Sequence, residues 1–410
     1  MVKQNNTYNI LHITPHLGGG VGTVLLNWLS NKNNKNINTI ATLDFANDKA
    51  KKICKEKRIE LYSAIDKEKL FQLVKEADIV LLHFWNHPLL YDLIINNELP
   101  PSRLVIWSHI SGLVAPNIID EKILNYPDKF IYTTTISKEI KENETILSTG
   151  GIEHLKDVKN EKHEGFTVGY IGTVDLAKMH PKYVETLSKT NADKFIILGG
   201  NQEKEISSGA DPRFEFMGKV DDIKPYISKM DVFGYLLNPK HFGTAEQAIQ
   251  EALAVGVVPV VLNNKCEKSL VKHMETGLVA NNLEEYVKYI DLLKKDKTLF
   301  NKLRENGKKY ALAHFSLNNL NNSWNKVFDE VITYSKTPKK WNTTRKINSS
   351  YDIFLESLGE FGDEFEKMTN NEIRELLKQS HFQSNSKGTP KQYYEFLHGN
   401  KLKKLCDMYL

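Results

Sequence analysis

Short apolar runs alternate with amphipathic stretches along most of the chain. Runs of strand length predict buried strands, and apolar residues that recur every three to four positions between them predict helices. In the first half, strands are predicted at 8–14, 39–44, 59–63, 78–83, 104–109 and 132–137. Strands separated by helical stretches of this length indicate a parallel, doubly wound α/β sheet.

The same alternation restarts with the run FTVGYIG at 166–172. It predicts further strands at 195–198, 214–216, 232–236 and 257–262, again with helical stretches between them. A second doubly wound sheet is therefore expected. Ligands of such sheets bind beyond the carboxyl ends of the strands, so candidate site residues are sought in the loops there.

The polar, charged stretch 153–165 has no periodicity, which is typical of an interdomain connection. We therefore predict a Rossmann-like domain at 1–152, a linker at 153–165, a second Rossmann-like domain with its last helices at 166–335, and a helical extension at 336–410.

The extension opens with a polar, basic stretch, 336–350, in which Trp341 is expected to be exposed. Amphipathic patterns then predict helices within 351–366, 370–379 and 391–410. Three roles remain open for this segment: packing on the body, a homodimer contact, or acceptor binding. The basic stretch could also touch an anionic membrane surface.

The segment 241–262, HFGTAEQAIQEALAVGVVPVVL, predicts a helix that runs directly into a buried strand. Thr244 and Gln247 have the spacing of a capping box, and Gly256 is placed to end the helix. Phe242 and Gly243 would then leave bare backbone amides at the positive end of the helix dipole. A phosphate binds well at such a place.

Two acids lie on the predicted helix. Glu246 is either a first-turn acid favoured by the dipole or a site residue, and the residues alone do not decide between them. Glu251 falls on the polar side of the helix, so a solvated surface position is the plainer interpretation.

A glycine-rich turn, Gly18–Gly22, follows the first predicted strand and precedes a helical stripe. Strand, glycine turn and helix form a phosphate-cradling arrangement, in which Gly19, Gly20 and Gly22 would let a ligand approach the backbone. Taken alone, this signal is weak, because the spacing differs from that of the dinucleotide fingerprint.

His109 ends the predicted strand RLVIWSH, at a position suited to a ligand contact; a structural histidine is the alternative. His16, His83 and His87 are weaker candidates. Without matching acids or cysteines, none of these histidines is interpreted as a metal ligand.

Lys178 follows Gly172, the end of the strand FTVGYIG, by six residues and could reach a ligand at that edge. A flexible ammonium suits a diphosphate leaving group, whose developing charge needs stabilisation. The alternative is a surface lysine.

Composition narrows the functional class. The chain has 410 residues and a formal net charge of +4, too small a charge to indicate nucleic-acid binding by itself. Three widely spaced cysteines fit a reducing cytoplasm and form neither a disulfide framework nor a metal cluster. The amino-terminal stretch resembles no secretion signal and no long apolar run occurs, so a cytoplasmic protein, at most peripheral at a membrane, is expected.

The run Glu251-Ala-Leu-Ala-Val-Gly-Val-Val-Pro-Val-Val, following a Phe-Gly turn, resembles the donor-sugar signature of retaining glycosyltransferases of the GT-B fold, family 4 (group 1). The common pattern of that family has two glutamates eight residues apart. Here the residue eight before Glu251 is Gly243, and Glu246 is only five before, as in the variant Gly-Thr-x-Glu-Gln form. The resemblance covers about 8–335.

The resemblance implies roles for individual residues. His109 would reach the donor sugar, Glu251 the ribose, and Lys178 the diphosphate, with Thr173 standing where the family usually has an arginine. The donor would also be held by the following positions: the glycine loop with Gly19, Gly20 and Gly22; the turn Gly218 to Val220 at the nucleobase; and Phe242, Gly243 and Thr244 near the sugar. Glu246 is carried over as a catalytic residue.

The expected protein is thus a GT-B enzyme with two Rossmann-like domains facing a cleft. It would move a sugar, with retention, from a nucleotide-diphosphate donor to a hydroxyl of a glycan or lipid-linked glycan, in polysaccharide or glycoconjugate synthesis. No Asp-x-Asp motif lies on a suitable loop, so no metal cofactor is expected. A sugar-nucleotide epimerase and a non-catalytic scaffold partnering another transferase are the alternatives.

Overall fold

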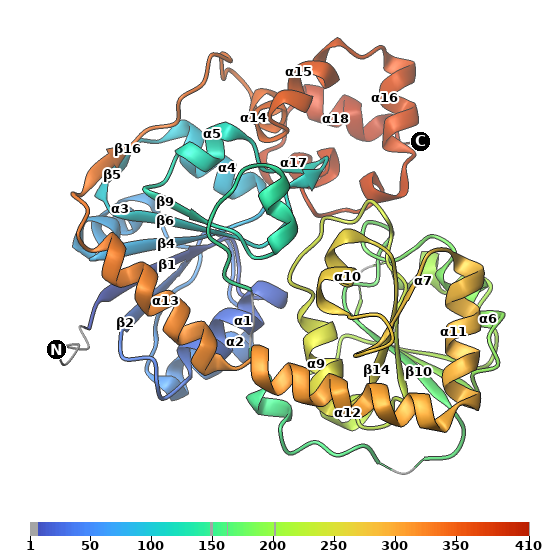
Figure 1. Ribbon diagram of the computed structural model, residues 1–410. Coiled ribbons are helices and arrows are strands. Elements are labelled where there is room, and N and C mark those ends of the chain that lie inside the picture. The colour runs from blue at the N-terminus through green and yellow to red at the C-terminus, as the bar shows by residue number, and fades with distance from the viewer. Residues whose placement is uncertain (1–6, 148–150, 162, 201, 410) are drawn as a thin grey trace. The chain divides into compact units, whose positions relative to one another are not determined.

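The computed structural model describes residues 7–147, 151–161, 163–200 and 202–409. The chain divides into two compact units (Figure 1). The first comprises Met1–Gly150 and Leu317–Leu410, and the second comprises Gly151–Ser316. Each unit is built on its own sheet.

The first unit contains a parallel six-stranded sheet in the order β3-β2-β1-β4-β6-β9. Its strands are β1 (Asn9–Thr14), β2 (Ile37–Thr42), β3 (Glu60–Tyr62), β4 (Ile79–Phe84), β6 (Leu104–Ser108) and β9 (Lys129–Ile131). The helices between them are α1 (Gly20–Leu29), α2 (Asp48–Lys57), α3 (Lys67–Glu76), α4 (Pro88–Asn96) and α5 (Glu121–Asn125).

The second unit repeats this topology in the order β12-β11-β10-β13-β14-β15. Its strands are β10 (Thr167–Ile171), β11 (Lys194–Leu198), β12 (Phe214–Gly218), β13 (Val232–Tyr235), β14 (Val258–Leu262) and β15 (Leu278–Ala280). Its helices are α6 (Tyr183–Ser188), α7 (Glu203–Ile206), α8 (Lys224–Ile227), α9 (Gln247–Val255), α10 (Lys265–Leu270), α11 (Leu283–Lys295) and α12 (Lys297–His314).

These two sheets confirm the predicted α/β class with two doubly wound, Rossmann-like units. In each sheet the strand order reverses beside the first strand, between β1 and β4 and between β10 and β13. Loops at the carboxyl ends of these strands form the crevice in which sheets of this type bind ligands.

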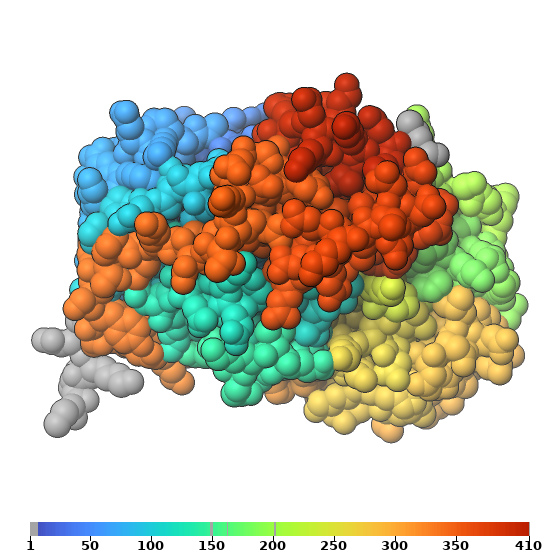
Figure 2. Space-filling view, turned by 90° about the horizontal axis from the view of Figure 1, so that it is seen from above, coloured from blue at the N-terminus to red at the C-terminus, as the bar shows by residue number. Residues whose placement is uncertain are grey.

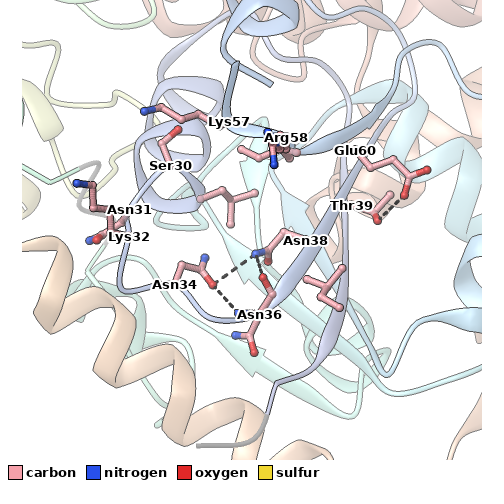
Figure 3. A pocket seen from close by; sticks show the side chains of 13 residues that line it. Ser30, Asn31, Lys32, Asn34, Asn36, Asn38, Thr39, Lys57, Arg58 and Glu60 are labelled. Atoms are coloured by element: carbon pink, nitrogen blue, oxygen red, sulfur yellow. Dashed lines mark hydrogen bonds between the residues drawn. The ribbon is translucent and has the colours of Figure 1, made fainter. Parts of the chain in front are cut away.

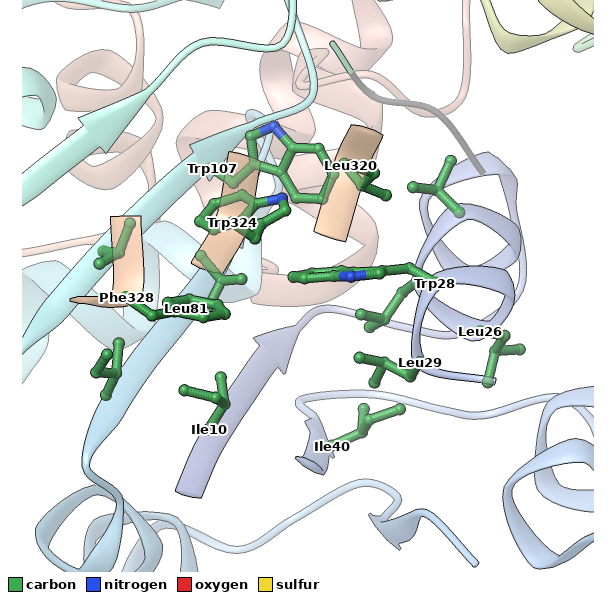
Figure 4. Close-up of a cluster of buried hydrophobic side chains, with 14 of the residues drawn as sticks. Ile10, Leu26, Trp28, Leu29, Ile40, Leu81, Trp107, Leu320, Trp324 and Phe328 are labelled. Carbon is green, nitrogen blue, oxygen red and sulfur yellow. The ribbon is translucent and has the colours of Figure 1, made fainter. Parts of the chain in front are cut away.

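A tryptophan cluster forms the core of the first unit, and Figure 4 shows it between α1, β6 and α13 (Leu317–Val331). The rings of Trp28, Trp107 and Trp324 lie 5.0 to 5.9 Å apart, centroid to centroid. The indole N–H of Trp28 donates to Asn321 Oδ1 at 2.7 Å, so its polar edge is satisfied in the buried cluster.

The boundary of the second unit differs from the predicted range 166–335. Helix α13 belongs to the first unit, because Leu320, Trp324 and Phe328 bury their side chains in the core of that unit. At the other end, part of the predicted linker is structured: the 3₁₀ turn η2 (Glu153–Leu155) belongs to the second unit and buries Leu155.

The segment 336–410 packs on the rest of the first unit, and Figure 2 shows it (orange to red) spread over that unit's surface. It begins with β16 (Thr337–Lys339), which pairs with β5 (Leu99–Ser102). Its helices are α14 (Ser350–Ser357), α15 (Glu360–Lys367), α16 (Asn370–Leu377), α17 (Pro390–Leu397) and α18 (Asn400–Asp407). The predicted long helices are thus each broken in two, at Gly359 and Gly399, which have positive φ.

Two local expectations are wrong. Trp341, expected to be exposed, is buried, and its indole N–H donates to Glu356 Oε1 at 2.9 Å. In addition, 132–137, which has the β-branched composition of a strand, leaves the sheet after β9 and enters the 3₁₀ helix η1 (Thr135–Glu139). There Ser137 Oγ donates to the Ser111 carbonyl at 2.8 Å.

Candidate functional site

A buried ion pair lies at the carboxyl edge of the second sheet, at its switch point. Lys178, in the loop after β10, places its ammonium 2.6 Å from Glu246 Oε2, at the start of α9. The side chains are only 6% and 1% exposed, so the pair is shielded from solvent. The predicted surface-lysine alternative for Lys178 is therefore wrong.

The loop that carries Lys178 is held by a buried aspartate. Asp175 Oδ1 accepts from the backbone N–H groups of Ala177 and Lys178, at 2.9 and 3.1 Å. The Lys178 carbonyl in turn accepts from the N–H of Asn238, in the loop that follows β13. The lysine backbone is thus fixed on two sides before its side chain reaches the acid.

Both oxygens of the Glu246 carboxylate are engaged. Tyr235 donates its hydroxyl to Oε2 at 2.7 Å, alongside Lys178, while the amide and hydroxyl of Thr244 donate to Oε1 at 3.1 and 3.0 Å. Burial is the largest influence on the pKa of Glu246 and raises it, but the charge of Lys178, the electrostatic effect of His241 and the hydrogen bonds from Lys178 and Tyr235 together outweigh burial and lower the pKa to about 2.

The capping prediction for this helix is wrong. Helix α9 begins at Gln247, and its N-cap is Glu246 in the left-handed region, φ 44°, without a side-chain cap. The Glu246 carboxylate folds back on Thr244, so the Thr244 hydroxyl is bonded to Glu246 and does not cap the helix. Gly256 does end the helix as predicted, with φ 87°.

The backbone N–H groups before α9, which were expected to be free for a ligand, in part donate hydrogen bonds within the protein. The N–H of Gly243 donates to His241 Nδ1 at 3.0 Å, and that of Thr244 to Glu246. Because a backbone N–H can only donate, His241 Nδ1 accepts and its Nε2 carries the proton, which it donates to Glu267 Oε2 at 3.0 Å. The first-turn amides of α9 itself, at Gln247 and Ala248, precede the first intrahelical bond.

Glu251 is buried rather than on the solvated surface that its place on the polar side of the helix favours. The 3₁₀ turn η2 packs over this part of α9, with His154 Nε2 3.6 Å and Gln247 Nε2 3.3 Å from Glu251 Oε1. Burial raises the pKa of Glu251 to about 7, only partly offset by the Gln247 hydrogen bond. A carboxyl group with this pKa exchanges its proton near neutral pH.

The remaining predicted residues of the second unit occupy the same edge of the sheet. The ring of Phe242 is buried and its centroid lies 4.9 Å from Lys178 Nζ. Thr173 follows β10 and accepts at its carbonyl from the Tyr170 hydroxyl. Gly218 ends β12 with φ 67°, its carbonyl accepting from the N–H of Gly199, and Val220 follows half-buried.

In the first unit, the predicted glycine loop is shorter than expected. Gly19 is the N-cap of α1, while Gly20 and Gly22 lie within the first turn of that helix. A Cβ on Gly22 would come within 3.1 Å of the Leu17 backbone, whereas none of the described atoms stands within 4 Å of one on Gly20. Gly20 therefore has open space beside the helix terminus.

His109 follows β6 and is 6% exposed. Its Nε2 lies 3.0 Å from Nδ1 of His83 in β4, and burial lowers the pKa of His109 to about 3. The imidazole is therefore neutral at physiological pH. His16 stacks on Phe45, and His87 contacts Phe396 of the extension at the same edge.

A pocket of about 570 Å³ lies at the opposite, amino-terminal edge of the first sheet, and Figure 3 shows its asparagine-rich lining. Asn34, Asn36 and Asn38 bond to one another on its wall. Because doubly wound sheets bind ligands at the carboxyl edge, this pocket is separate from the candidate site.

The described residues contain no group of three or more His, Cys, Asp or Glu side chains arranged to hold a metal ion. Nor does any helix among them have the length and apolarity needed to cross a membrane.

Sequence reasoning missed the supporting residues Asp175, Tyr235 and His241. The one signal for His241 was its place directly before Phe242-Gly243; Tyr235 gives no signal, because it is one of many aromatic residues in apolar runs. His12, which continues the histidine contacts of His83, was missed because it lies inside an apolar strand.

Comparison with known proteins gives matches to glycosyltransferases. Residues 151–310 match the family model of glycosyl transferases group 1. A segment of 175 residues is 23% identical to a GDP-Man:Man(3)GlcNAc(2)-PP-Dol alpha-1,2-mannosyltransferase from Dictyostelium discoideum, and spans about a third of that protein, 34%.

Solved structures resemble most of the chain. Alr3699/HepE from Anabaena, in complex with UDP and glucose, aligns with a TM-score of 0.64 at 14% identity, over 79% of this chain and 100% of that one. A glycosyltransferase from Rickettsia africae aligns with a TM-score of 0.62 at 14% identity, over 80% and 100%. The chain therefore has the GT-B fold of two Rossmann-like units, and residues 151–310 within it match the model of the group 1 glycosyl transferases.

Proposed function

We propose that the protein transfers a sugar from a nucleotide-diphosphate donor to a hydroxyl of a glycan or lipid-linked glycan, with retention of configuration. The observation that carries the proposal is the Lys178–Glu246 pair at the switch point of a group 1 glycosyl transferase unit. The resemblance to Alr3699/HepE, which was crystallised with UDP and glucose, supports the donor class.

In this proposal Lys178 holds the donor diphosphate. Its ammonium has three N–H donors, one of which is directed at Glu246, and its position is fixed by the Asp175 turn. As the bond to the sugar breaks, negative charge builds on the diphosphate, and a preorganised ammonium in a buried place stabilises that charge effectively. The first-turn amides of α9 add partial positive charge.

Glu246 has a positioning role in this account. Its two oxygens are occupied by Lys178, Tyr235 and Thr244, so it orients the lysine. Glu251 is proposed to accept hydrogen bonds from the ribose hydroxyls, and the Gly218 to Val220 turn to contact the nucleobase.

We further propose that no metal cofactor is needed, because the ammonium of Lys178 and the α9 amides supply the charge that a metal would otherwise supply. Thermal stabilisation by UDP, GDP, ADP and CMP, each with and without EDTA, tests this. A ligand at about 100 times its Kd adds about 2.7 kcal/mol of stability. We expect one nucleotide to stabilise selectively and EDTA to change nothing.

Lys178→Ala should abolish that stabilisation, whereas the matched variant Lys182→Ala, at an exposed lysine of the same loop, should keep it. If no nucleotide stabilises the wild-type protein, the donor proposal is wrong. If stabilisation requires a divalent ion, the metal-independent mechanism is wrong.

A non-catalytic binding protein is the second candidate. Thr173 stands where group members usually supply an arginine, and Lys178 is already paired with an acid. Such a protein would bind the nucleotide without turnover. Release of free nucleotide from its sugar donor, dependent on an added glycan acceptor and lost in Lys178→Ala, would exclude it.

A further inference from the structure

Four polar side chains form a continuous hydrogen-bonded line across the first sheet. Asn38 Oδ1 lies 3.0 Å from His12 Nε2, His12 Nδ1 lies 3.1 Å from His83 Nε2, and His83 Nδ1 lies 3.0 Å from His109 Nε2. The line ends at the candidate sugar-contacting residue, His109. We refer to these four residues as the histidine relay.

The relay follows from the register of four neighbouring strands. His12 is level with Ile40 of β2 and Leu81 of β4, and His83 is level with Trp107 of β6. Asn38 lies two residues before Ile40, His83 two after Leu81, and His109 two after Trp107. Because side chains two residues apart share a face, all four lie on one face, each a step nearer the carboxyl edge.

The three imidazoles are neutral. His12 and His83 are fully buried and His109 is 6% exposed. Burial lowers the pKa of His12 to about 4 and that of His109 to about 3; for His83, burial and then the neighbouring His109 and His12 lower it well below its usual value. A neutral imidazole has one donor and one acceptor nitrogen, so protons along the line must all point the same way.

Backbone groups set that direction. The N–H of Asn36, which can only donate, bonds to Asn34 Oδ1 at 3.1 Å. The Asn36 carbonyl, which can only accept, receives Asn38 Nδ2 at 2.8 Å, with Asn34 Oδ1 3.4 Å away from the same nitrogen. Figure 3 shows these bonds in the asparagine pocket. The amide nitrogen of Asn38 is thereby assigned, and its oxygen faces His12.

The oxygen of Asn38 then determines the donor and acceptor of every following hydrogen bond in the relay. Asn38 Oδ1 accepts from His12 Nε2–H, His12 Nδ1 accepts from His83 Nε2–H, and His83 Nδ1 accepts from His109 Nε2–H. The remaining nitrogen of His109, Nδ1, carries a lone pair. No hydrogen bond from the described part of the chain reaches it.

We propose that Asn38, His12 and His83 are positioning residues that fix the tautomer of His109, so that Nδ1 accepts a hydrogen bond from a neutral sugar hydroxyl. The sugar assignment rests on the proposed function; the tautomer does not. A lone pair on a neutral ring attracts a hydroxyl and repels a carboxylate, so a neutral hexose is selected over a hexuronate.

The tautomer is tested by ¹⁵N-histidine NMR of the full chain at pH 7. Signals of His109 are identified by their absence in His109→Gln. We expect the Nε2–H tautomer in the wild-type protein. Asn38→Leu removes the acceptor that sets the direction and should convert His109 to a mixture, whereas Asn97→Leu, a half-buried asparagine of the same unit outside the relay, should change nothing.

An Nδ1–H or protonated His109 in the wild-type protein overturns the proposal, and so does a His109 signal unaffected by Asn38→Leu in a folded variant. Since this measurement uses no ligand, it judges the relay even if the proposed function is wrong.

Sugar selection is tested by titrating wild-type protein with UDP-glucose and UDP-glucuronate. We expect at least about tenfold weaker binding of the uronate, equivalent to about 1.4 kcal/mol. The ratio should shrink in Asn38→Leu, because His109 can then present an N–H, and persist in Asn97→Leu. Equal affinity of the wild-type protein for the two overturns the selection.

Discussion

The two sheets share one strand order but carry opposite chemistry at their carboxyl edges. In the second unit the edge is ionic: Lys178 is paired with Glu246, and Glu251 lies buried nearby. In the first unit the buried candidate residue at the corresponding edge is uncharged: His109 ends a neutral relay. Strand order therefore fixes where on the sheet a ligand binds, and the side chains at that edge decide whether a charged or a neutral group is bound.

The two units should therefore respond differently to acid: the first should lose stability as pH falls from 7 to 4, whereas the ion pair of the second should persist. This is the largest expected effect. A histidine whose folded pKa is below its ordinary 6.5 holds fewer protons folded than unfolded, so stability is lost as pH falls below 6.5. From pH 7 to 4, His12 and His109 together should cost the first unit on the order of 6 kcal/mol. Glu246, with its lowered pKa, should keep its contribution until pH falls through the range below 4.5.

All five tryptophans (28, 85, 107, 324 and 341) lie in the first unit, so tryptophan fluorescence monitors it selectively. We expect its emission to shift in acid before hydrogen exchange rises in peptides of the second unit. His12→Gln keeps a donor and an acceptor but cannot be protonated, and should move the fluorescence midpoint to lower pH. Simultaneous unfolding of both units would contradict the comparison.

Removal of the cation from the Lys178–Glu246 ion pair should have the next largest effect. Lys178→Met leaves the buried Glu246 carboxylate without its cation and should destabilise the second unit by about 3–5 kcal/mol. Denaturant unfolding followed by hydrogen exchange in 166–262 measures it. The double variant Lys178→Met, Glu246→Gln removes both charges and should recover most of the loss; equal losses in both variants would mean that the charge is not the cause.

Glu251→Gln should alter the pH dependence of the second unit alone. The folded pKa of about 7 exceeds the ordinary 4.5, so the folded state holds a proton that the unfolded chain releases, and stability falls as pH rises through this window. The change is about 3 kcal/mol. In Glu251→Gln this loss of stability between pH 4.5 and 7 should disappear, while Glu284→Gln, at an exposed acid, should retain it.

The smallest effect is expected at the solvent-exposed pair Lys189–Glu185, whose side chains are 62% and 56% exposed. Lys189→Ala should leave the unfolding midpoint of the second unit unchanged, because water and salt screen such pairs. A clear destabilisation there would show that ion pairing, rather than burial, decides the cost at Lys178.

Much of the frame could be predicted from the sequence. Strand lengths and the periodicity between them gave both parallel sheets, and Gly256 marked the end of α9, because these depend on local spacing and backbone freedom. Several candidate residues, Lys178, Glu246 and Glu251 among them, lie together at one edge because loops at strand ends converge there.

The side-chain partners could not be predicted. The residues alone could not decide whether Glu246 is a first-turn acid or a site residue, because its cation lies 68 positions away, and its left-handed backbone displaced the predicted cap. Glu251 lies on the polar side of its helix, but it is buried because η2, from the supposed linker, covers it. Periodicity describes one element and carries no information on what packs against it.

The sequence by itself thus determined the two sheets, the glycine stops and the places where chemistry is expected, since each follows from short-range spacing. Only the tertiary structure decided the charge state of the site: which acid meets Lys178, which carboxyl titrates near neutrality, and which way the protons of the histidine relay point. Those properties depend on desolvation and on hydrogen bonds between residues brought together from distant strands, and neither is written in the spacing along the chain.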